Sequence, residues 1–271
     1  MLLESEKTPF VETTVAKHML SRMEMTHKER GIMVASGPWG IGKTSAIDAF
    51  AEKYERYCVV VKVEPGPASG KGTSSSKMMQ LTLESLRHAR IGSTYSQLGR
   101  SAWLLRQMIR EHLTRHFDDV DWPAHMEPPP FTFIFDEAQY LSREAIDVLR
   151  FWNDHDRTTT PFPVGLIFVG NNEFAMEETL GGESVLSGAV RSRLLFELPL
   201  AYKHLTDTDL TLFAQSMGVK DANALREIVA YFNQPRIKRD LRQAKRLLTI
   251  CLRDTEDGNV DAETVRKVFG L

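Results

Sequence analysis

The chain reads Gly37-Pro38-Trp39-Gly40-Ile41-Gly42-Lys43-Thr44-Ser45 shortly after the apolar run Ile32-Met33-Val34-Ala35. This stretch matches the pattern G-x-x-x-x-G-K-[ST], placed where a buried strand would turn into a helix. Glycines let successive backbone N–H groups point inward around a phosphate, and the following helix adds the positive end of its dipole. In such a loop the lysine, Lys43, reaches the β- and γ-phosphates, and the Thr44 hydroxyl is a ligand for Mg²⁺. The motif therefore predicts that residues 37–45 bind ATP with Mg²⁺.

A second candidate site ends another apolar run, Phe133-Ile134-Phe135-Asp136-Glu137. Ligands of open α/β sheets bind at the carboxyl ends of the strands, which is where both acids would lie. There Asp136 would hold Mg²⁺ through water, and Glu137 would polarise the water that attacks the γ-phosphate. The alternative is a strand end that meets solvent with two ordinary acids. With a phosphate loop upstream, the pair favours ATP hydrolysis.

The pattern of apolar runs predicts the fold class. Short β-branched and apolar runs, several of them continuously apolar, alternate with helical stretches, as in a parallel sheet that is covered on both faces. The predicted strands are 32–35, 58–63, 131–135, 164–169 and 194–198, and the predicted helices between them are 11–28, 43–56, 75–89, 95–116, 142–154 and 173–180. Strand signals end at Pro199, and three or four helices follow, near 206–217, 221–232, 236–253 and 261–269. We therefore predict an α/β P-loop domain with a five-stranded parallel sheet over 1–200 and a small α-helical lid domain over 201–271.

Composition restricts the possible classes of protein. Lys and Arg number 34 against 36 Asp and Glu, for a net charge of −2, which excludes a uniformly basic nucleic-acid coat and a disordered acidic tail. No apolar run approaches the ~18 residues that span a bilayer, and the first seven residues lack the pattern of a secretion signal. The two cysteines, Cys58 and Cys251, are far apart and lack a metal-binding spacing. The sequence predicts a cytoplasmic protein without membrane contact.

One strand-helix unit separates the phosphate loop from Asp136 and Glu137, and in this the chain resembles AAA+ ATPases. The resemblance implies a first sensor after the fourth strand, which is Asn171 or, as the alternative, Asn172. It also implies an arginine finger that reaches the ATP of a neighbouring subunit, and Arg193 is preferred to Arg191 for that role.

The resemblance extends to a second sensor in the lid. The segment Asn233-Gln234-Pro235-Arg236 is similar to that element, although the family's glycine is missing, and it implies that Arg236, or else Arg239, contacts the nucleotide. Trp39 could pack over the nucleotide or against a neighbouring subunit.

Three further segments resemble the AAA+ ATPases that regulate transposition, the group that includes phage Mu B. They read DEAQYL at 136–141, VLRFWND at 148–154 and VGLIFVGN at 164–171. The resemblance implies ATP-dependent self-association into a ring or helical filament on double-stranded DNA, and recruitment of a transposase for target selection. A helicase loader or replication initiator would carry the same nucleotide motifs, so that class remains the alternative. A nucleotide-switch signalling ATPase that does not bind DNA is the alternative from another class.

Basic residues are concentrated in two stretches. Residues 87–115 hold six arginines and a single acid, and residues 233–253 hold seven basic residues and a single acid. In the family, DNA passes along segments that follow the second and third strands, which implies contacts from Lys71, Lys77, Arg87 and Arg90. Such contacts would be made to the phosphate backbone and would not read sequence. Solvated helix faces and subunit contacts explain the same charges equally well. The aromatic Trp103 falls on the apolar side of its predicted helix, which favours a place in the core over base stacking.

Overall fold

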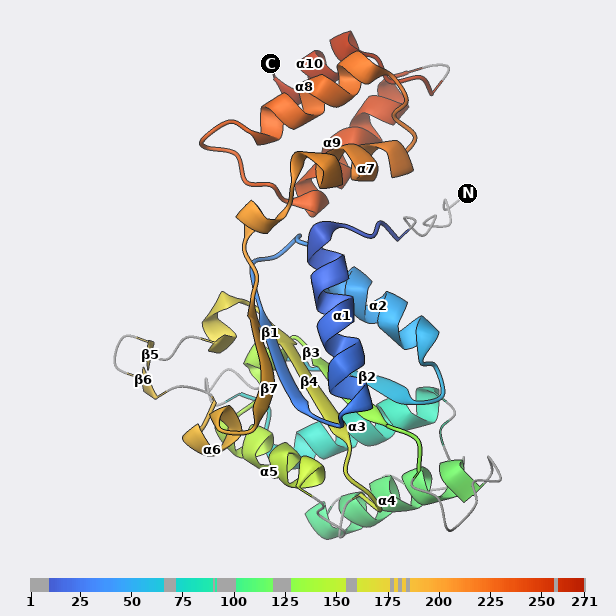
Figure 1. Cartoon of the computed structure of the whole chain (residues 1–271), viewed down its shortest axis with the longest axis vertical. Coiled ribbons are helices and arrows are strands. Elements are labelled where there is room, and N and C mark those ends of the chain that lie inside the picture. Colours follow the sequence, from blue (N-terminus) through green and yellow to red (C-terminus); the bar gives the residue numbers. More distant parts are fainter. Residues whose placement is uncertain are drawn as a thin grey trace. The chain divides into compact units, whose positions relative to one another are not determined.

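The computed structural model describes most of the chain, and Figure 1 shows its elements. The described residues are 10–65, 72–89, 91, 101–118, 128–154, 160–175, 178–179, 182–183, 186–255 and 258–270. They divide into two compact units. The sheet unit comprises Leu20–Ser36 and Ile47–Pro199, and the helical unit comprises the described residues of Met1–Met19, Gly37–Ala46 and Leu200–Leu271. Among the described helices, none is long and apolar enough to span a membrane.

The sheet unit is built on a five-stranded parallel sheet, which confirms the predicted fold class. Its strands are β1 (Ile32–Ser36), β2 (Cys58–Lys62), β3 (Thr132–Asp136), β4 (Gly165–Gly170) and β7 (Leu194–Pro199). They lie in the order β2-β3-β4-β1-β7. Every residue of β1, β3 and β4 is buried, as their largely apolar sequences require when helices cover both faces.

The register brings the carboxyl ends of the central strands to one edge of the sheet. Asp136 of β3 is paired with Val169 of β4, and Gly170, the next residue of β4, is paired with Ser36, the last residue of β1. The phosphate loop begins at the residue after Ser36. The loop and the acids therefore leave the sheet at the same edge.

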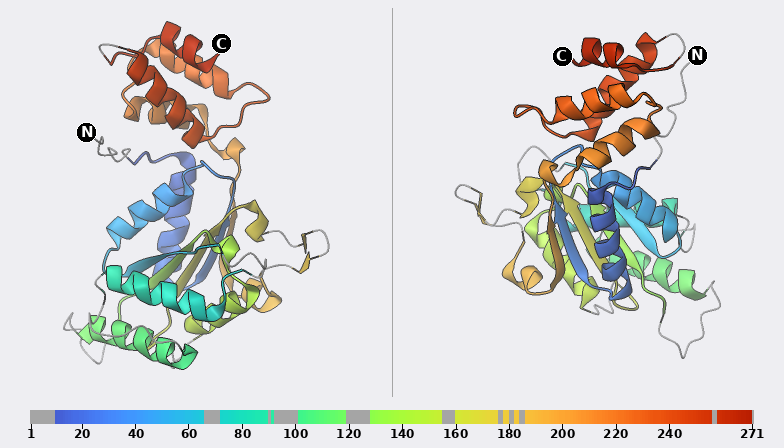
Figure 2. Two further views of the ribbon diagram at one scale, coloured as in Figure 1. Left: turned by 180° about the vertical axis from the view of Figure 1, so that it is seen from behind. Right: turned by 45° about the horizontal axis from the view of Figure 1, so that its top comes forward.

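Helices cover both faces of the sheet (Figures 1 and 2). The helices α3 (Ser75–His88), α4 (Ala102–Asp118) and α5 (Arg143–Asn153) bury their apolar sides in one cluster with the sheet. In this cluster the rings of Phe133 and Trp152 lie 5.4 Å apart, centroid to centroid. The helices α1 (Thr14–Lys28) and α2 (Lys43–Lys53) meet where His27 contacts the ring of Tyr54, at 4.5 Å. A short helix, α6 (Gly188–Arg191), precedes β7.

Four helices make up most of the helical unit. They are α7 (Asp207–Ser216), α8 (Ala222–Phe232), α9 (Leu241–Asp254) and α10 (Ala262–Phe269), and a 3₁₀ turn, η3 (Tyr202–His204), leads into them. Each is capped at its start by a side-chain oxygen, from Thr206, Asp221, Asp240 and Asp261 respectively. Such caps satisfy N–H groups that have no partner within the helix, and they explain where each helix begins.

Two predicted helices differ from the structure, and of a third, predicted over 95–116, the first residues lie outside the described part of the chain. The helix predicted over 173–180 is wrong: a 3₁₀ turn, η2 (Asn172–Ala175), and two-residue strands β5 (Glu178–Thr179) and β6 (Gly182–Glu183) occupy this region. The helix predicted from residue 236 begins at Leu241, because the Asp240 side chain accepts hydrogen bonds from the N–H groups of Arg242 and Gln243.

The aromatic Trp103 was also wrongly predicted. It lies near the start of α4 and is 69% exposed, whereas Leu105, Ile109 and Leu113 of the same helix are buried. The buried apolar face of α4 is therefore formed by those residues and does not include Trp103.

Two of the buried histidines, His27 and His112, are expected to make stability depend on pH. Burial lowers the pKa of His27 and of His112 below its usual range. The unfolded chain therefore takes up protons first as the pH falls through about 6.5, and protonation then favours unfolding. We expect the free energy of unfolding, measured by urea denaturation, to fall between about pH 7.5 and pH 5.5.

The variant His112→Gln should make this pH dependence shallower, and His18→Gln, at an exposed position of α1, is the matched control. An equal slope for the wild type and both variants would contradict the assignment to His112.

Candidate nucleotide site and its surroundings

The phosphate loop connects β1 to α2, which begins at Lys43. The Lys43 ammonium donates hydrogen bonds to the carbonyls of Gly37, at 2.7 Å, and Pro38, at 2.8 Å. Gly40 and Gly42 have φ values of +75° and +94°, which residues with a side chain rarely adopt. The glycines therefore permit a backbone course that other residues would strain, as the motif predicts.

The loop also contacts the start of α9 within the helical unit. The N–H of Leu241 donates to the carbonyl of Gly40 at 2.8 Å, and a Cβ at Gly40 would lie only 1.8 Å from Asp240 Oδ1. The hydroxyl of Tyr202 donates to the carbonyl of Trp39 at 3.0 Å, and the Trp39 side chain is 57% exposed. Gly40 is thus required both by its backbone conformation and by the close approach of Asp240.

The two acids lie at the carboxyl end of β3. Asp136 is 7% exposed, and its Oδ1 accepts a hydrogen bond from the N–H of Glu137 at 3.0 Å. Glu137 is half-buried and has left-handed backbone angles, φ 58° and ψ 39°. A non-glycine residue in this region is uncommon and is often found at functional sites. Here it turns the chain from β3 into the 3₁₀ turn η1 (Ala138–Tyr140).

Gln139 is a site residue that sequence reasoning missed. Its Nε2 donates to Glu137 Oε2 at 2.6 Å, and its Oε1 accepts from the backbone N–H of Asn171 at 3.1 Å. The contact between Gln139 and Asn171 depends on β3 and β4 being neighbours in the sheet, and a linear sequence carries no direct signal for it.

The predicted sensor Asn171 lies directly after β4. Its Oδ1 accepts from the N–H of Glu173 at 3.0 Å, and its Nδ2 donates to Glu173 Oε2 at 3.4 Å. The side chain thus starts the 3₁₀ turn η2, which is the ordinary role of Asn in a turn. The adjacent Asn172 is exposed.

The two candidate finger arginines differ in exposure and partners. The Arg193 side chain is 40% exposed, and its Nε donates to Asp154 Oδ1 at 3.0 Å. The Arg191 side chain is 23% exposed and lies 3.6 Å from Glu197 Oε1. Asp154 also binds Arg150, at 3.1 Å, so one carboxylate at the end of α5 orders Arg193 on the surface of the sheet unit.

The two candidates for the second sensor also differ. Arg239 donates to Asp207 Oδ1 at 2.6 Å and is also bound to the carbonyl of Leu205 and to Asn233 Oδ1. These contacts fasten the start of α7 to the end of α8, which is a structural role. Arg236 is exposed, so of the two it is the arginine with the more accessible side chain.

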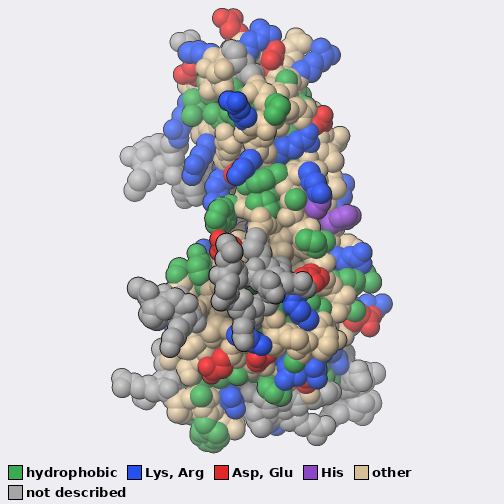
Figure 3. Space-filling model, turned by 90° about the vertical axis from the view of Figure 1, so that its left-hand side faces the viewer, with side chains coloured by type: hydrophobic (Ala, Val, Ile, Leu, Met, Phe, Trp, Pro, Cys, Tyr) green, Lys and Arg blue, Asp and Glu red, His purple; other side chains and the backbone are tan. Residues whose placement is uncertain are grey.

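The predicted DNA contacts are only partly described. Lys71 and Arg90 lie outside the described residues. The Lys77 side chain is 47% exposed and lies 3.8 Å from Glu64 Oε2, while Arg87 is half-buried. The helix α9 presents Arg242, Lys245 and Arg246 as exposed residues, opposite a buried face that includes Leu248 and Cys251. Lys and Arg side chains are frequent over the C-terminal helices in the upper part of Figure 3.

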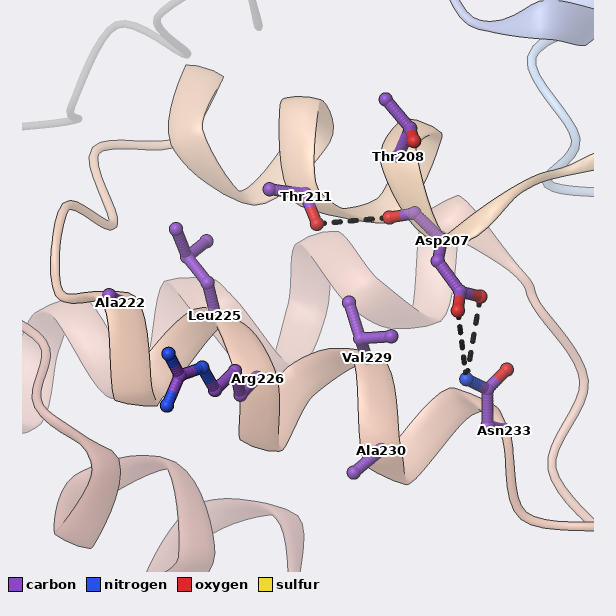
Figure 4. Close-up of a pocket in the computed structure, with 9 residues that line it drawn as sticks. All are labelled: Asp207, Thr208, Thr211, Ala222, Leu225, Arg226, Val229, Ala230 and Asn233. Atoms are coloured by element: carbon purple, nitrogen blue, oxygen red, sulfur yellow. Dashed lines mark hydrogen bonds between the residues drawn. The ribbon is translucent and has the colours of Figure 1, made fainter.

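A hollow of about 620 Å³ lies between α7 and α8 (Figure 4). Leu225 and Val229 contribute apolar surface to it, and at one end Asp207 accepts hydrogen bonds from Asn233 at 3.3 and 3.4 Å. Because these polar groups are paired with each other, the lining is typical of an apolar surface and not of a catalytic site.

Comparison with known proteins agrees with the observed fold. No curated protein gives a significant match. Among solved structures, Cdc6p from Pyrobaculum aerophilum is 16% identical, with a TM-score of 0.66 over 98% of this chain and 69% of Cdc6p. Orc1 from Aeropyrum pernix, in complex with DNA, is 16% identical, with a TM-score of 0.54 over 98% of this chain and 67% of Orc1. The RuvB Holliday junction branch migration motor of Thermotoga maritima is 17% identical, with a TM-score of 0.53 over 94% of this chain and 68% of RuvB.

At these identities the structural similarity establishes the fold. The family follows from the sequence profile of the AAA domain, which matches residues 26–176. This segment is more than half of the chain and contains the phosphate loop, Asp136, Glu137 and Asn171. The chain is a P-loop protein of the AAA domain family.

Proposed function

We propose that this protein is a Mg²⁺-dependent ATP hydrolase that binds double-stranded DNA and self-associates into a ring or helical filament on it. The observation that carries the proposal is the shared sheet edge, from which the phosphate loop departs after Ser36 and at which β3 ends in Asp136, followed by Glu137. This edge is where open α/β sheets bind their ligands. Hydrolysis needs a phosphate cradle and a carboxylate that polarises water, and residues 37–45 and Glu137 supply them.

The residues present fit ATP and magnesium. Mg²⁺ binds oxygen ligands, and the Thr44 hydroxyl and the Asp136 carboxylate are the candidate donors. A carboxylate as buried as that of Asp136 is stabilised by a nearby cation. When bound, the ion would neutralise charge on the β- and γ-phosphates. The backbone of residues 37–45 and the Lys43 ammonium would hold the phosphates, and Glu137 would accept hydrogen bonding from the attacking water.

One asparagine and two arginines would complete the site. Asn171 is proposed to contact the γ-phosphate, Arg236 to contact the nucleotide of its own subunit, and Arg193, with Arg191 as the alternative, to act on the nucleotide of a neighbour. The exposure of Arg193 and Arg236 supports these roles, because a group that reaches another chain or a bound nucleotide must be accessible.

DNA binding is proposed from charge and from the relatives. Lys77 is exposed on the segment that follows β2, and the exposed side of α9 is basic. Orc1 from Aeropyrum pernix and ORC from Drosophila have been solved with DNA, and both share the fold of this chain. Contacts to the phosphate backbone would make binding strongly dependent on salt and largely independent of sequence.

For the partner, the similarity to Cdc6p and Orc1 favours a role of the replication-initiator or helicase-loader type. The segments 136–141, 148–154 and 164–171 favour the other candidate, recruitment of a transposase. Affinity purification from the native host separates the two, because a replicative helicase should be recovered in the first case and a transposase in the second.

Stimulation of ATP hydrolysis by duplex DNA tests the DNA-binding part of the proposal. We expect DNA to stimulate ATP hydrolysis at low salt and the stimulation to be lost as the salt concentration rises. In Lys77→Gln, the slope of the logarithm of the DNA-binding constant against the logarithm of the salt concentration should fall in magnitude by about 1. Lys53→Gln is the matched control, because Lys53 is an exposed lysine paired with a glutamate, as Lys77 is. A rate of ATP hydrolysis that is the same with and without duplex DNA at every salt concentration would favour a nucleotide-switch signalling ATPase instead.

A further inference from the structure

Gln139 connects the candidate water-polarising carboxylate to the end of the neighbouring strand. Its Nε2 lies 2.6 Å from Glu137 Oε2, and its Oε1 lies 3.1 Å from the backbone nitrogen of Asn171. Since a backbone N–H can only donate, the oxygen of the carboxamide must face Asn171 and the NH₂ group must face Glu137. The orientation of the amide is therefore determined by its two partners.

The surroundings hold Gln139 in this position. A Cβ at Gly170 would lie 3.1 Å from Gln139 Oε1, so the glycine leaves the room in which the carboxamide approaches β4. On the other side of η1, the N–H of Thr73 donates to the carbonyl of Tyr140 at 2.5 Å. The N–H of Ser142 donates to the carbonyl of Thr73 at 3.0 Å. The turn that carries Gln139 is thus hydrogen-bonded to the segment after β2 as well as to β4.

We propose that Gln139 is a positioning residue for ATP hydrolysis, which holds the Glu137 carboxylate through one oxygen and directs the other toward the attacking water. The inference rests on the proposed hydrolase function. Glu137 precedes the turn η1, but its half-buried side chain makes no capping hydrogen bond with that turn, and the amide of Gln139 supplies a restraint on the carboxylate instead. Since Gln139 also accepts a hydrogen bond from the backbone N–H of Asn171, it fixes the distance between the Glu137 carboxylate and the candidate sensor Asn171.

The test is a double-mutant cycle between Gln139 and Glu137, read by single-turnover ATP hydrolysis. Gln139→Met keeps the length of the side chain and removes both hydrogen bonds. We expect it to lower kcat about 10–100-fold, the scale of a misplaced reacting group, while KM for ATP changes less than about twofold. In the Glu137→Gln background the same substitution should have no further effect, because the carboxylate that it positions is gone.

A second variant separates the two hydrogen bonds of Gln139. Gln139→Glu still accepts from the N–H of Asn171 but presents an acceptor to Glu137 in place of a donor, so it should lose as much activity as Gln139→Met. Gln215→Met, at an exposed position of α7, controls for the change of side chain, and melting temperatures report folding.

Each outcome has a separate meaning. An unchanged kcat in Gln139→Met, or the same fractional loss in both backgrounds, would overturn the role of Gln139 while leaving the hydrolase intact. Wild-type protein without ATP hydrolysis that depends on Lys43 and Glu137 would overturn the proposed function itself.

Discussion

Replacing Glu137 with Gln is expected to lower the turnover number for ATP by about 10²–10⁴-fold, the usual contribution of a general base, while ATP still binds. The amide has nearly the shape of the carboxylate but cannot accept a proton from water. The amide oxygen can still accept the hydrogen bond that Gln139 Nε2 donates at 2.6 Å, and the backbone N–H of residue 137 still donates to Asp136 Oδ1 at 3.0 Å. The local structure should therefore be preserved. Phosphate release measures the turnover, and binding of a fluorescent ATP analogue measures the affinity.

The same variant should retain ATP and therefore remain assembled on DNA. Negative-stain electron microscopy with ATP and duplex DNA should show a persistent ring or filament for Glu137→Gln, whereas Lys43→Ala, which loses the phosphate contact, should lose both ATP binding and assembly. Glu137→Gln protein that stays monomeric with ATP and DNA would contradict the proposed self-association.

Replacing Arg193 with Ala is expected to lower kcat by about 10³-fold or more, as removal of an arginine finger does in related phosphoryl transfers. Arg193 is exposed and fixed by Asp154, so it can reach a neighbouring subunit from a defined position. The loss should appear in kcat rather than in ATP affinity, because the charge that a finger stabilises develops in the transition state. Its exposed ion pair with Asp154 contributes little to stability, so folding should be preserved.

Mixing two inactive variants tests whether Arg193 acts between subunits. A Glu137→Gln subunit, which is expected to stay assembled, keeps its own Arg193 and can supply it to the intact site of an Arg193→Ala subunit. Mixed protein should therefore hydrolyse ATP although each variant alone does not. Arg191→Ala is the matched comparison, and a larger loss in Arg191→Ala than in Arg193→Ala would assign the finger to Arg191.

Local chemistry explains which parts of the fold the sequence predicts well. The strands at 32–36, 132–136 and 165–170 are built on the short apolar runs 32–35, 133–135 and 164–169, and all of the strand residues are buried. The helices α7 and α8 begin one residue after the capping residues Thr206 and Asp221. These signals lie within a few residues of each other along the chain, so they can be read without knowing the fold.

The errors arise where distant segments decide the environment. His112 and His116 are buried, and their partners are the distant backbone carbonyls of Ile91 and Arg56. Trp103 lies outside the apolar stripe of α4. In each case the deciding partner or packing surface is only partly visible in the local pattern.

The sequence by itself determined the phosphate loop at residues 37–45, the paired acids at 136 and 137, and the five apolar strands, because each is a short pattern with a direct physical requirement. Only the tertiary structure decided that Gln139 joins Glu137 to Asn171, that Arg239 is used to fasten α7 to α8, and that Arg193 is ordered by Asp154. These contacts join residues that are 2 to 39 positions apart. Their formation depends on the order of strands in the sheet and on the packing of helices, which pair residues by position in space and not by distance along the chain.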